Sequence, residues 1–137
     1  MRELLSAIAA RLGQALSLPV HICPEEALPA AAQLPCLSLA DGAVSVVPLA
    51  GGRREEELDV HVCCHVAPLG EEALSADGGL LALSAQVQAT LEGDLLGLSG
   101  LVEARCAAHE PSRLHEWRGR LLLTRRSLFK YLREVPA

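Results

Sequence analysis

The nine residues LDVHVCCHV (Leu58–Val66) decide the fold class, because their side chains alternate without interruption. One set consists of apolar side chains and one thiol: Leu58, Val60, Val62, Cys64 and Val66. The other set is mostly polar: Asp59, His61, Cys63 and His65. A period of two residues is that of a β-strand, so one face of this strand is predicted to be buried and the other to be wet.

Upstream of this strand, the sequence predicts a hairpin. Pro35–Asp41 alternates apolar with small polar side chains, and Ala43–Leu49 is a second extended stretch. The dipeptide Asp41-Gly42 stands between them, and Asp-Gly favours a two-residue turn. We therefore expect two antiparallel strands before Leu58–Val66.

The stretches on either side of the hairpin are predicted to be irregular. Gly51–Glu57, GGRREEE, is interpreted as a polar loop tip. Val20–Leu34 is rich in proline and has no clean period. Within it, Val20–Cys23 has the composition of a short edge strand, and Pro24–Gln33 that of a loop or a single helical turn.

Two segments have the spacing of amphipathic helices. Arg2–Leu18 carries apolar side chains three or four residues apart, and Pro19 ends the pattern. A second helix is predicted through Leu80–Leu91, capped by Ser75 or Asp77.

The C-terminal part is predicted to add two strands. The first is Val102–His109, with an inner face formed by Val102, Ala104, Cys106 and Ala108. The second is Trp117–Thr124, with Trp117, Leu121 and Leu123 pointing inward and Arg118 and Arg120 outward. Residues 125–137 are interpreted either as a short C-terminal helix or as an extension of the last strand.

This order, α-βββ-α-ββ, predicts an α+β fold in which two helices pack on one face of a mostly antiparallel sheet. The 137 residues have the size of a single domain, so residues 1–137 are interpreted as one unit. Half of the residues are apolar and only 2% are aromatic, so the core is expected to consist of Leu, Val and Ala.

The charges are unevenly distributed along the chain. Residues 25–110 contain 14 acidic and 3 basic residues, whereas residues 111–137 contain 7 basic and 2 acidic ones. An acidic body with a basic end favours head-to-tail contact between copies, although the same arginines could simply solvate an exposed strand. The net charge of −5 and the few aromatic residues do not suit specific nucleic-acid binding.

The cysteine content and the N-terminal segment indicate a cellular compartment. Five cysteines is an odd number, and their spacing fits no disulfide framework. Arg11 and Gln14 interrupt the apolar stretch that a secretory signal would need, and no apolar run approaches the roughly 20 residues of a membrane span. We therefore expect reduced thiols in a cytosolic protein that does not contact a membrane.

No motif predicts catalysis or a cofactor. His61, Cys63 and His65 share one strand face, but a structural zinc site needs four convergent ligands, and no C-x-x-C motif is present. The serines lie in no nucleophile elbow, and the glycines match no phosphate or dinucleotide loop. The sequence thus predicts a protein without enzymatic activity, with metal binding at His61, Cys63 and His65 as an open alternative.

The pattern over nearly the whole chain resembles the tail terminator (tail completion) proteins of long-tailed bacteriophages. The likeness rests on the order of these segments: the helix ELLSAIAARLGQAL, the strand LPCLSLADG, the charged loop and long strand GRREEELDVHVCCHVAP, a second helix, the link GDLLGLSGLVEARC, and the closing strand HEWRGRLLLT. The resemblance implies a phage or prophage origin and an α+β fold.

The resemblance also implies a function without cofactor, metal or reaction. Family members form a ring, usually a hexamer, that caps the tail tube, ends tube polymerisation and presents a surface to the head-tail connector. The implied partners are other copies of the chain, the tail tube protein and the connector protein. The implied location is the virion tail, assembled in the cytoplasm of a bacterial host.

The charge asymmetry suggests which residues make these contacts. We predict a subunit or tube interface at these charged positions: Arg53, Arg54, Glu55, Glu56, Glu57, Arg118, Arg120, Arg125 and Arg126. Alternative functions are another head-tail connector or minor tail subunit, a small metal-binding domain, and an adaptor for a partner protein.

Overall fold

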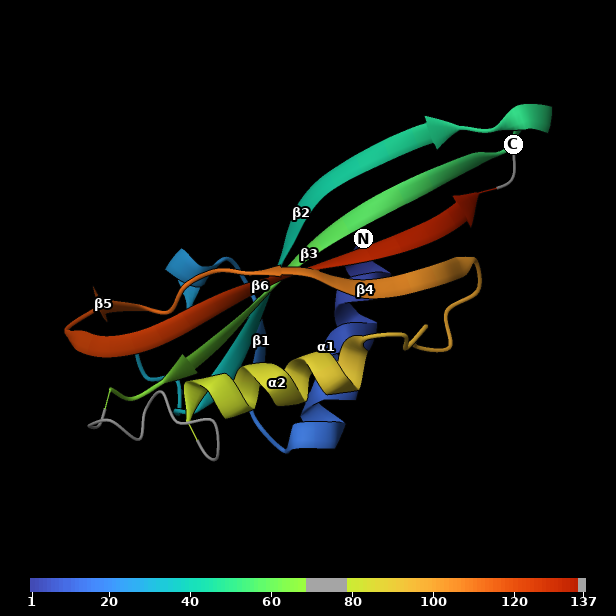
Figure 1. Ribbon diagram of the computed structural model, residues 1–137. Coiled ribbons are helices and arrows are strands. Elements are labelled where there is room, and N and C mark those ends of the chain that lie inside the picture. The colour runs from blue at the N-terminus through green and yellow to red at the C-terminus, as the bar shows by residue number, and fades with distance from the viewer. Residues whose placement is uncertain (69–78, 136–137) are drawn as a thin grey trace.

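The computed structural model describes residues 1–68 and 79–135 of the chain (Figure 1). In chain order its elements are α1 (Arg2–Leu16), β1 (Val20–Ile22), the short 3-10 turn η1 (Glu25–Ala27), β2 (Cys36–Pro48), the turn η2 (Ala50–Gly52), β3 (Arg54–Val66), α2 (Leu80–Leu91), β4 (Leu101–His109), β5 (Arg113–Trp117) and β6 (Arg120–Val135). Both helices lie where their spacing predicts them. Ser75 and Asp77, the expected caps of α2, lie outside the described residues.

A single sheet carries both helices on one of its faces (Figure 1). The strand order is β1-β2-β3-β6-β4, and β5 pairs with the first residues of β6. The short edge strand β1 runs parallel to β2, and all other pairs are antiparallel. The predicted α+β class, with two helices on one face of a mostly antiparallel sheet, is therefore confirmed. The order α-βββ-α-ββ also fits, with the last strand extended into a hairpin of β5 and β6.

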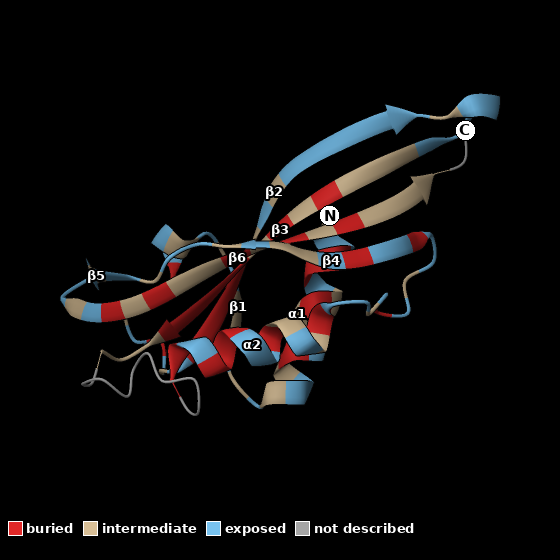
Figure 2. Ribbon diagram, viewed as in Figure 1, coloured by how far each residue is buried: buried red, intermediate tan, exposed pale blue. Residues whose placement is uncertain are grey.

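The main core lies between the helices and the sheet, where Figure 2 shows the buried positions in red. Its largest fully buried side chains are Ile8, Leu12, Leu37, Leu39, Leu58, Leu80, Leu91, Phe129 and Tyr131. Burying one such side chain stabilises the fold by about 1.5–3 kcal/mol. The apolar stripes of α1 and α2 therefore determine which face of the sheet the helices cover.

The opposite face of the sheet is also covered near β1, so the predicted wet face of Leu58–Val66 is wrong at this end. The proline-rich segment after β1 contributes to a second, smaller cluster, which contains Leu28, Ala32, Cys36 and Leu122, with Cys23, Leu34 and Trp117 partly buried against it. Cys63 and His65 are buried on the same face. Alternation along a strand identifies its two faces, but it cannot reveal that an irregular segment covers the second one.

The predicted hairpin around Asp41-Gly42 is wrong, because Cys36–Pro48 forms one strand paired with β3 along its length. The register shifts between Asp41 and Val44, which is a β-bulge. A Cβ atom at Gly42 would lie 2.9 Å from Asp59 Cβ and 3.1 Å from the Asp59 carbonyl oxygen. The glycine is therefore needed for close approach to β3, a common role of glycine in bulges, and not for a turn.

The true tight turn of the C-terminal half lies at Arg118-Gly119. Both residues have positive φ, 48° and 80°, which is the backbone of a two-residue hairpin turn. Beyond this turn the predicted inner face is wrong for Leu121, which is 55% exposed, whereas Leu122 is 1% exposed and packs in the second cluster on the other face. Leu123, also predicted to point inward, is partly buried against the main core. Residues 120–135 form one strand, which decides between the two interpretations of residues 125–137 in favour of a strand extension through Val135.

Two bulges also correct the predicted inner face of Val102–His109. The pairing of β4 with β6 shifts between Leu101 and Glu103 and again between Cys106 and Ala108. Leu101 and Ala104 are consequently buried, whereas Val102 and Ala108 are exposed.

The sheet continues past the helices as an arm, formed by Val44–Pro48 of β2, Arg54–Leu58 of β3 and Tyr131–Val135 of β6 (Figure 1). Leu58 and Tyr131, at the base of the arm, still pack in the main core. The polar tip predicted at Gly51–Glu57 is confined to Ala50–Arg53, because β3 begins at Arg54. Figure 2 shows β2 exposed along the arm.

Candidate functional site

The nine charged residues predicted to form an interface lie at two opposite ends of the β3–β6 strand pair. Arg53, Arg54, Glu55, Glu56 and Glu57 lie in the arm, where Arg54 is paired with Val135. Arg118, Arg120, Arg125 and Arg126 lie in the β5–β6 hairpin and the first part of β6, where Arg126 is paired with Cys63. Within one chain, the two groups do not come together.

Two acidic residues of the arm, Glu56 and Glu57, are paired with basic residues of β6. Arg133 Nη2 donates to Glu56 Oε2 at 2.6 Å, and Lys130 Nζ donates to Glu57 Oε1 at 2.8 Å and lies 3.3 Å from Asp59 Oδ1. These hydrogen bonds lower the pKa of Glu56 and Glu57 and raise the pKa of Lys130. Much of the charge asymmetry seen along the sequence is therefore compensated inside the chain.

Three residues at the tip of the arm form a second charge group. Glu55 and Glu134 are directly opposite each other on β3 and β6, an unfavourable like-charge pair. Arg53 Nη1 lies 2.8 Å from Glu134 Oε1 and relieves this repulsion. The arm tip thus exposes a mixed group of charges and not the acidic run expected from the sequence.

The two arginines at the β5–β6 turn have different surroundings. Arg120 Nη1 donates to the carbonyl oxygens of Ala30 and Ala32 at 2.8 Å and 2.7 Å, so it holds the proline-rich segment against the sheet. Trp117 Nε1 donates to the Leu28 carbonyl oxygen at 2.7 Å and adds to the same attachment. Arg118 is exposed at the turn, with its guanidinium 5.1 Å from the centre of the Trp117 ring.

Arg125 and Arg126 lie on opposite faces of β6. Arg126 forms a two-point contact with Glu110, with N–O distances of 2.5 Å and 2.8 Å. This pair raises the pKa of Arg126 and lowers that of Glu110. Arg125 is on the face that also carries Ser127 and Phe129, towards the helices, since side chains alternate along a strand.

The exposed valines near the two edges of the sheet were missed by the search for charged residues. Along the arm, β2 exposes Val44, Val46 and Val47, and at the other edge of the sheet β4 exposes Val102. The run GAVSVVPL (Gly42–Leu49) contains no charged residue, which is unusual for an unprotected edge strand. The lack of charged residues in this run is the sequence feature that could have indicated an exposed apolar edge strand.

The histidine and thiol group of β3 shares one face, as predicted, but its members do not converge. His61 and His65 are four residues apart on an extended strand, roughly 13 Å. Both ring nitrogens of His65 share hydrogen bonds, Nε2 with Ser38 Oγ and Nδ1 with Thr124 Oγ1, each at 2.8 Å. Burial raises the pKa of Cys63 to about 11. In the described part of the chain, no three His, Cys, Asp or Glu residues are grouped so that they could hold a metal ion.

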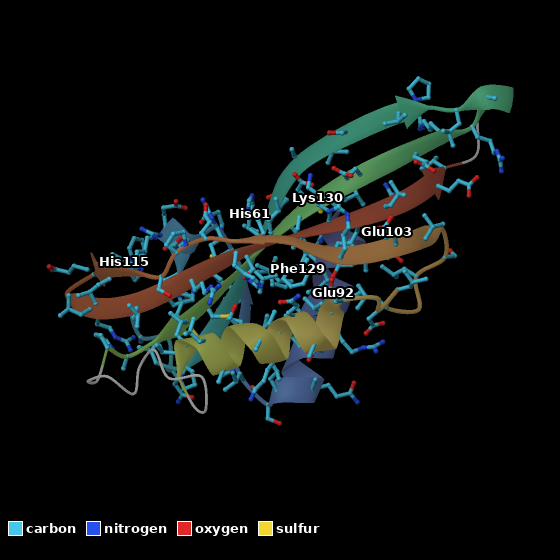
Figure 3. The ribbon with its side chains drawn as sticks, viewed as in Figure 1. His61, Glu92, Glu103, His115, Phe129 and Lys130 are labelled. Atoms are coloured by element: carbon cyan, nitrogen blue, oxygen red, sulfur yellow. The ribbon has the colours of Figure 1, made fainter. Side chains whose placement is uncertain are left out.

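Figure 3 shows the difference between the two faces of the sheet, with Phe129 towards the helices and His61 and Lys130 on the opposite side. On that opposite side, His115 Nε2 shares a hydrogen bond with Thr124 Oγ1 at 2.9 Å and lies 3.5 Å from Glu25 Oε1. This network extends the contacts of His65 to the proline-rich segment. These contacts attach the proline-rich segment to the outer face of the sheet.

On the helix side, His109 is the centre of a second polar group. Its Nδ1 is 2.6 Å from Ser127 Oγ, and its Nε2 is 2.9 Å from Gln88 Oε1 and 3.5 Å from Cys106 Sγ. Ser127 is only 2% exposed, so its hydroxyl cannot meet a substrate. Burial raises the pKa of the Cys106 thiol. The group connects α2 to β4 and β6.

An open hollow of about 510 Å³ lies beside the β1–β2 edge. It is lined by residues of α1, β1 and β2: Met1, Arg2, Leu5, Ser6, Ile22 and Asp41. Its walls combine apolar side chains with one acidic and one basic residue.

Among the described residues, no helix is long and apolar enough to cross a membrane.

Comparison with known proteins gives a match in fold only. No family model and no curated protein sequence matches the chain. Among solved structures, the chain is similar to one from the virion of a native gene transfer agent particle, with a TM-score of 0.63 and 17% sequence identity. The match covers 96% of this chain and 95% of that chain, so the two share a fold from end to end.

Proposed function

We propose that this chain is a structural subunit of a phage-like particle and acts by assembly, without catalysis. The observation that carries the proposal is the fold shared over 96% of the chain with a component of a gene transfer agent virion.

More specifically, the subunit forms a ring, as a hexamer, that caps the tail tube, ends tube polymerisation and joins the tail to the head connector. The support is the resemblance of the chain to tail terminators and the two-ended shape of the sheet. The arm tip around Arg53–Glu57 and the hairpin end at Arg118 lie at opposite ends of β3 and β6. Opposite ends of one subunit suit a protein that contacts the tube on one side and the connector on the other.

Deletion of the gene in a particle-producing host tests this function. Without a cap, electron micrographs should show filled heads without tails, together with detached tail tubes that exceed the normal length. Complementation with the intact gene should restore joined particles of normal tail length.

Gold labelling of a tagged copy separates this function from its alternatives. A tail cap predicts label at the head-proximal end of detached tubes. Label on tailless heads would instead indicate a connector subunit. A deletion strain with normal particles, and particles free of label, would contradict a structural function.

A further inference from the structure

The proline-rich segment after β1, residues 24–34, covers one end of the outer sheet face without pairing as a strand. Its backbone hydrogen bonds from Ala27 and Ala32 stay within the segment. Side chains of the sheet hold it in place, since Trp117 and Arg120 donate to its carbonyl oxygens. An irregular segment that is attached in this way opens at a lower free energy than paired strands do.

The segment covers a buried histidine and two buried thiols. His65 has no exposed surface, and Cys36, its neighbour on β2, packs against Leu28 of the segment. Cys63, on the same face of β3, has its Sγ atom 4.0 Å from Glu25 Oε2. If the segment left the sheet, all three buried side chains would meet water.

The polar atoms around His65 suit a neutral imidazole. His65 Nδ1 and His115 Nε2 both contact Thr124 Oγ1, at 2.8 Å and 2.9 Å. A single hydroxyl can donate to one ring and accept from the other, which satisfies two neutral rings. Because both nitrogens contact the same oxygen atom, they lie within about 6 Å of each other, where two positive charges repel.

The charged groups around His65 do not balance a proton on its ring. The basic groups that face it are His21 of β1, Arg113 and His115 of β5 and Arg120 of β6, and the acidic groups are Glu25 and Glu26 of η1. Arg113 already binds Glu25, and farther along β6 Arg126 binds Glu110. Among the described residues of this side, Glu26 is the carboxylate that is left, so a charged His65 would be surrounded mainly by basic groups.

We propose that residues 24–34 form an acid-released cover, which is closed over the outer sheet face while His65 and His115 are neutral. Protonation of the two rings releases the cover, and the helices and the sheet remain folded. The release takes place within one chain and does not depend on the proposed virion function.

The direction of the pH dependence follows from which form binds more protons. Burial lowers the pKa of His65 to about 4, and burial together with Arg113 lowers the pKa of His115, although Glu25 is 3.5 Å away. With the cover open, water reaches both rings, and their pKa returns towards the ordinary value of about 6.5. The closed form is therefore most stable above pH 6.5, and the open fraction rises as the pH falls from there towards 4.

The cysteines of the intact chain measure the release. Cys36 and Cys63 lie beneath the cover, whereas Cys64, which is 1% exposed, packs in the main core on the helix side. The chain is labelled with a dipyridyl disulfide at pH 7.5 and at pH 5, and mass spectrometry with fragmentation locates the label. Each rate is divided by the rate of the same thiol in the urea-denatured chain at the same pH. From His65 alone, the normalised rates of Cys36 and Cys63 should rise about 30-fold between these pH values.

Low concentrations of urea separate release of the cover from global unfolding. Global unfolding exposes far more surface, so the labelling of Cys64 should accelerate in urea below the unfolding midpoint, whereas that of Cys36 should barely change. At each pH, Cys36 and Cys63 should also react at least about tenfold faster than Cys64 after normalisation. Equal normalised rates for Cys36 and Cys64, with the same response to urea, would show global unfolding only and would overturn the proposal.

Substitution of His65 tests the origin of the pH dependence. His65→Gln should leave only the contribution of His115 to the acid-induced rise in the labelling of Cys36. His109→Gln is the matched control, because it removes an imidazole from the helix side of the sheet and should leave that rise unchanged. A His65→Gln chain that keeps the full wild-type rise would overturn the proposal.

Two further variants keep the test valid if His65→Gln does not fold. His115→Gln, at a position with 19% side-chain exposure, removes the second titrating ring and should also reduce the rise in the labelling of Cys36. Arg120→Ala removes an attachment whose charge does not change in this pH range, so it should accelerate the labelling of Cys36 by a similar factor at both pH values. A full wild-type rise in His115→Gln, or no acceleration in Arg120→Ala, would contradict the acid-released cover. Gold labelling of particles measures the virion function separately, so either hypothesis can fail without the other.

Discussion

At the scale of single residues, His65 shows how polar groups stabilise the outer face of the sheet. Its side chain has no exposed surface, and Ser38 and Thr124 each occupy one ring nitrogen. Burial, with smaller contributions from His115 and His21, lowers the pKa of His65 from 6.5 to about 4. The folded protein therefore holds this histidine in its neutral form.

Acidification is expected to destabilise the protein through His65. Between pH 6.5 and about 4, the unfolded chain binds a proton at this residue and the folded chain does not, so stability falls as the pH falls. The loss reaches about 3 kcal/mol at most. Denaturant titrations from pH 7 to pH 4 measure it, and His65→Gln should flatten this part of the curve. His61→Gln, at a partly exposed position on the same face, is the matched control for removal of an imidazole.

Arg120 and Arg118 provide a second prediction at the residue scale. Arg120→Ala removes two hydrogen bonds to the carbonyl oxygens of Ala30 and Ala32 and should destabilise the protein by about 1–3 kcal/mol. Arg118→Ala removes an exposed cation–π contact and should cost about 0.5–1 kcal/mol. Chemical denaturation of both variants gives the comparison, and equal losses would contradict the anchoring function of Arg120.

At the scale of elements, the bulge of β2 explains why a strong turn signal occurs inside a strand. Asp41-Gly42 lies where β2 bends from the part covered by β1 and the helices into the arm. The missing side chain of Gly42 allows β2 to approach Asp59 of β3. A turn dipeptide and a bulge dipeptide have the same residues, and only the pairing partner distinguishes them.

Alanine substitution of two glycines should have effects of opposite sign. Gly42→Ala places a Cβ 2.9 Å from Asp59 Cβ, and overpacking of this kind costs about 1–3 kcal/mol. Gly13→Ala adds a Cβ that meets nothing within 4 Å on α1 and should stabilise the protein by about 0.5–1 kcal/mol. Thermal denaturation measures both, and stabilisation by Gly42→Ala would contradict the close approach described for the bulge.

At the scale of the whole molecule, the charge asymmetry of the sequence has a different meaning in the structure. Glu56, Glu57 and Glu110 are paired with Arg133, Lys130 and Arg126 of β6. The basic C-terminal strand is thus the partner of the acidic strands in its own chain.

The ionic-strength dependence of association follows from this distribution. If exposed apolar side chains, such as those of Val44 and Val46, hold the copies together, association should persist or strengthen when NaCl is raised from about 0.05 M to about 1 M, where the screening length falls to about 3 Å. Light scattering at fixed protein concentration measures it. Dissociation in high salt would instead support a contact made by Arg118 and the other charged residues first chosen from the sequence.

The sequence by itself determined the elements whose signals are local. The spacing of apolar residues placed α1 and α2, and the alternation of Leu58–Val66 placed β3, because the 3.6-residue and two-residue periods are properties of each segment alone. The α+β class followed from the order of these elements.

Only the tertiary structure decided which surfaces are free. The cover over His65, the pairing of Glu57 with Lys130 and the bulges that expose Val102 all depend on residues far apart in the sequence. A one-residue shift in pairing moves a side chain to the other face of a sheet, and no local period records that shift. The charged candidates could therefore be chosen from the sequence, whereas the apolar edges of β2 and β4 required the strand order.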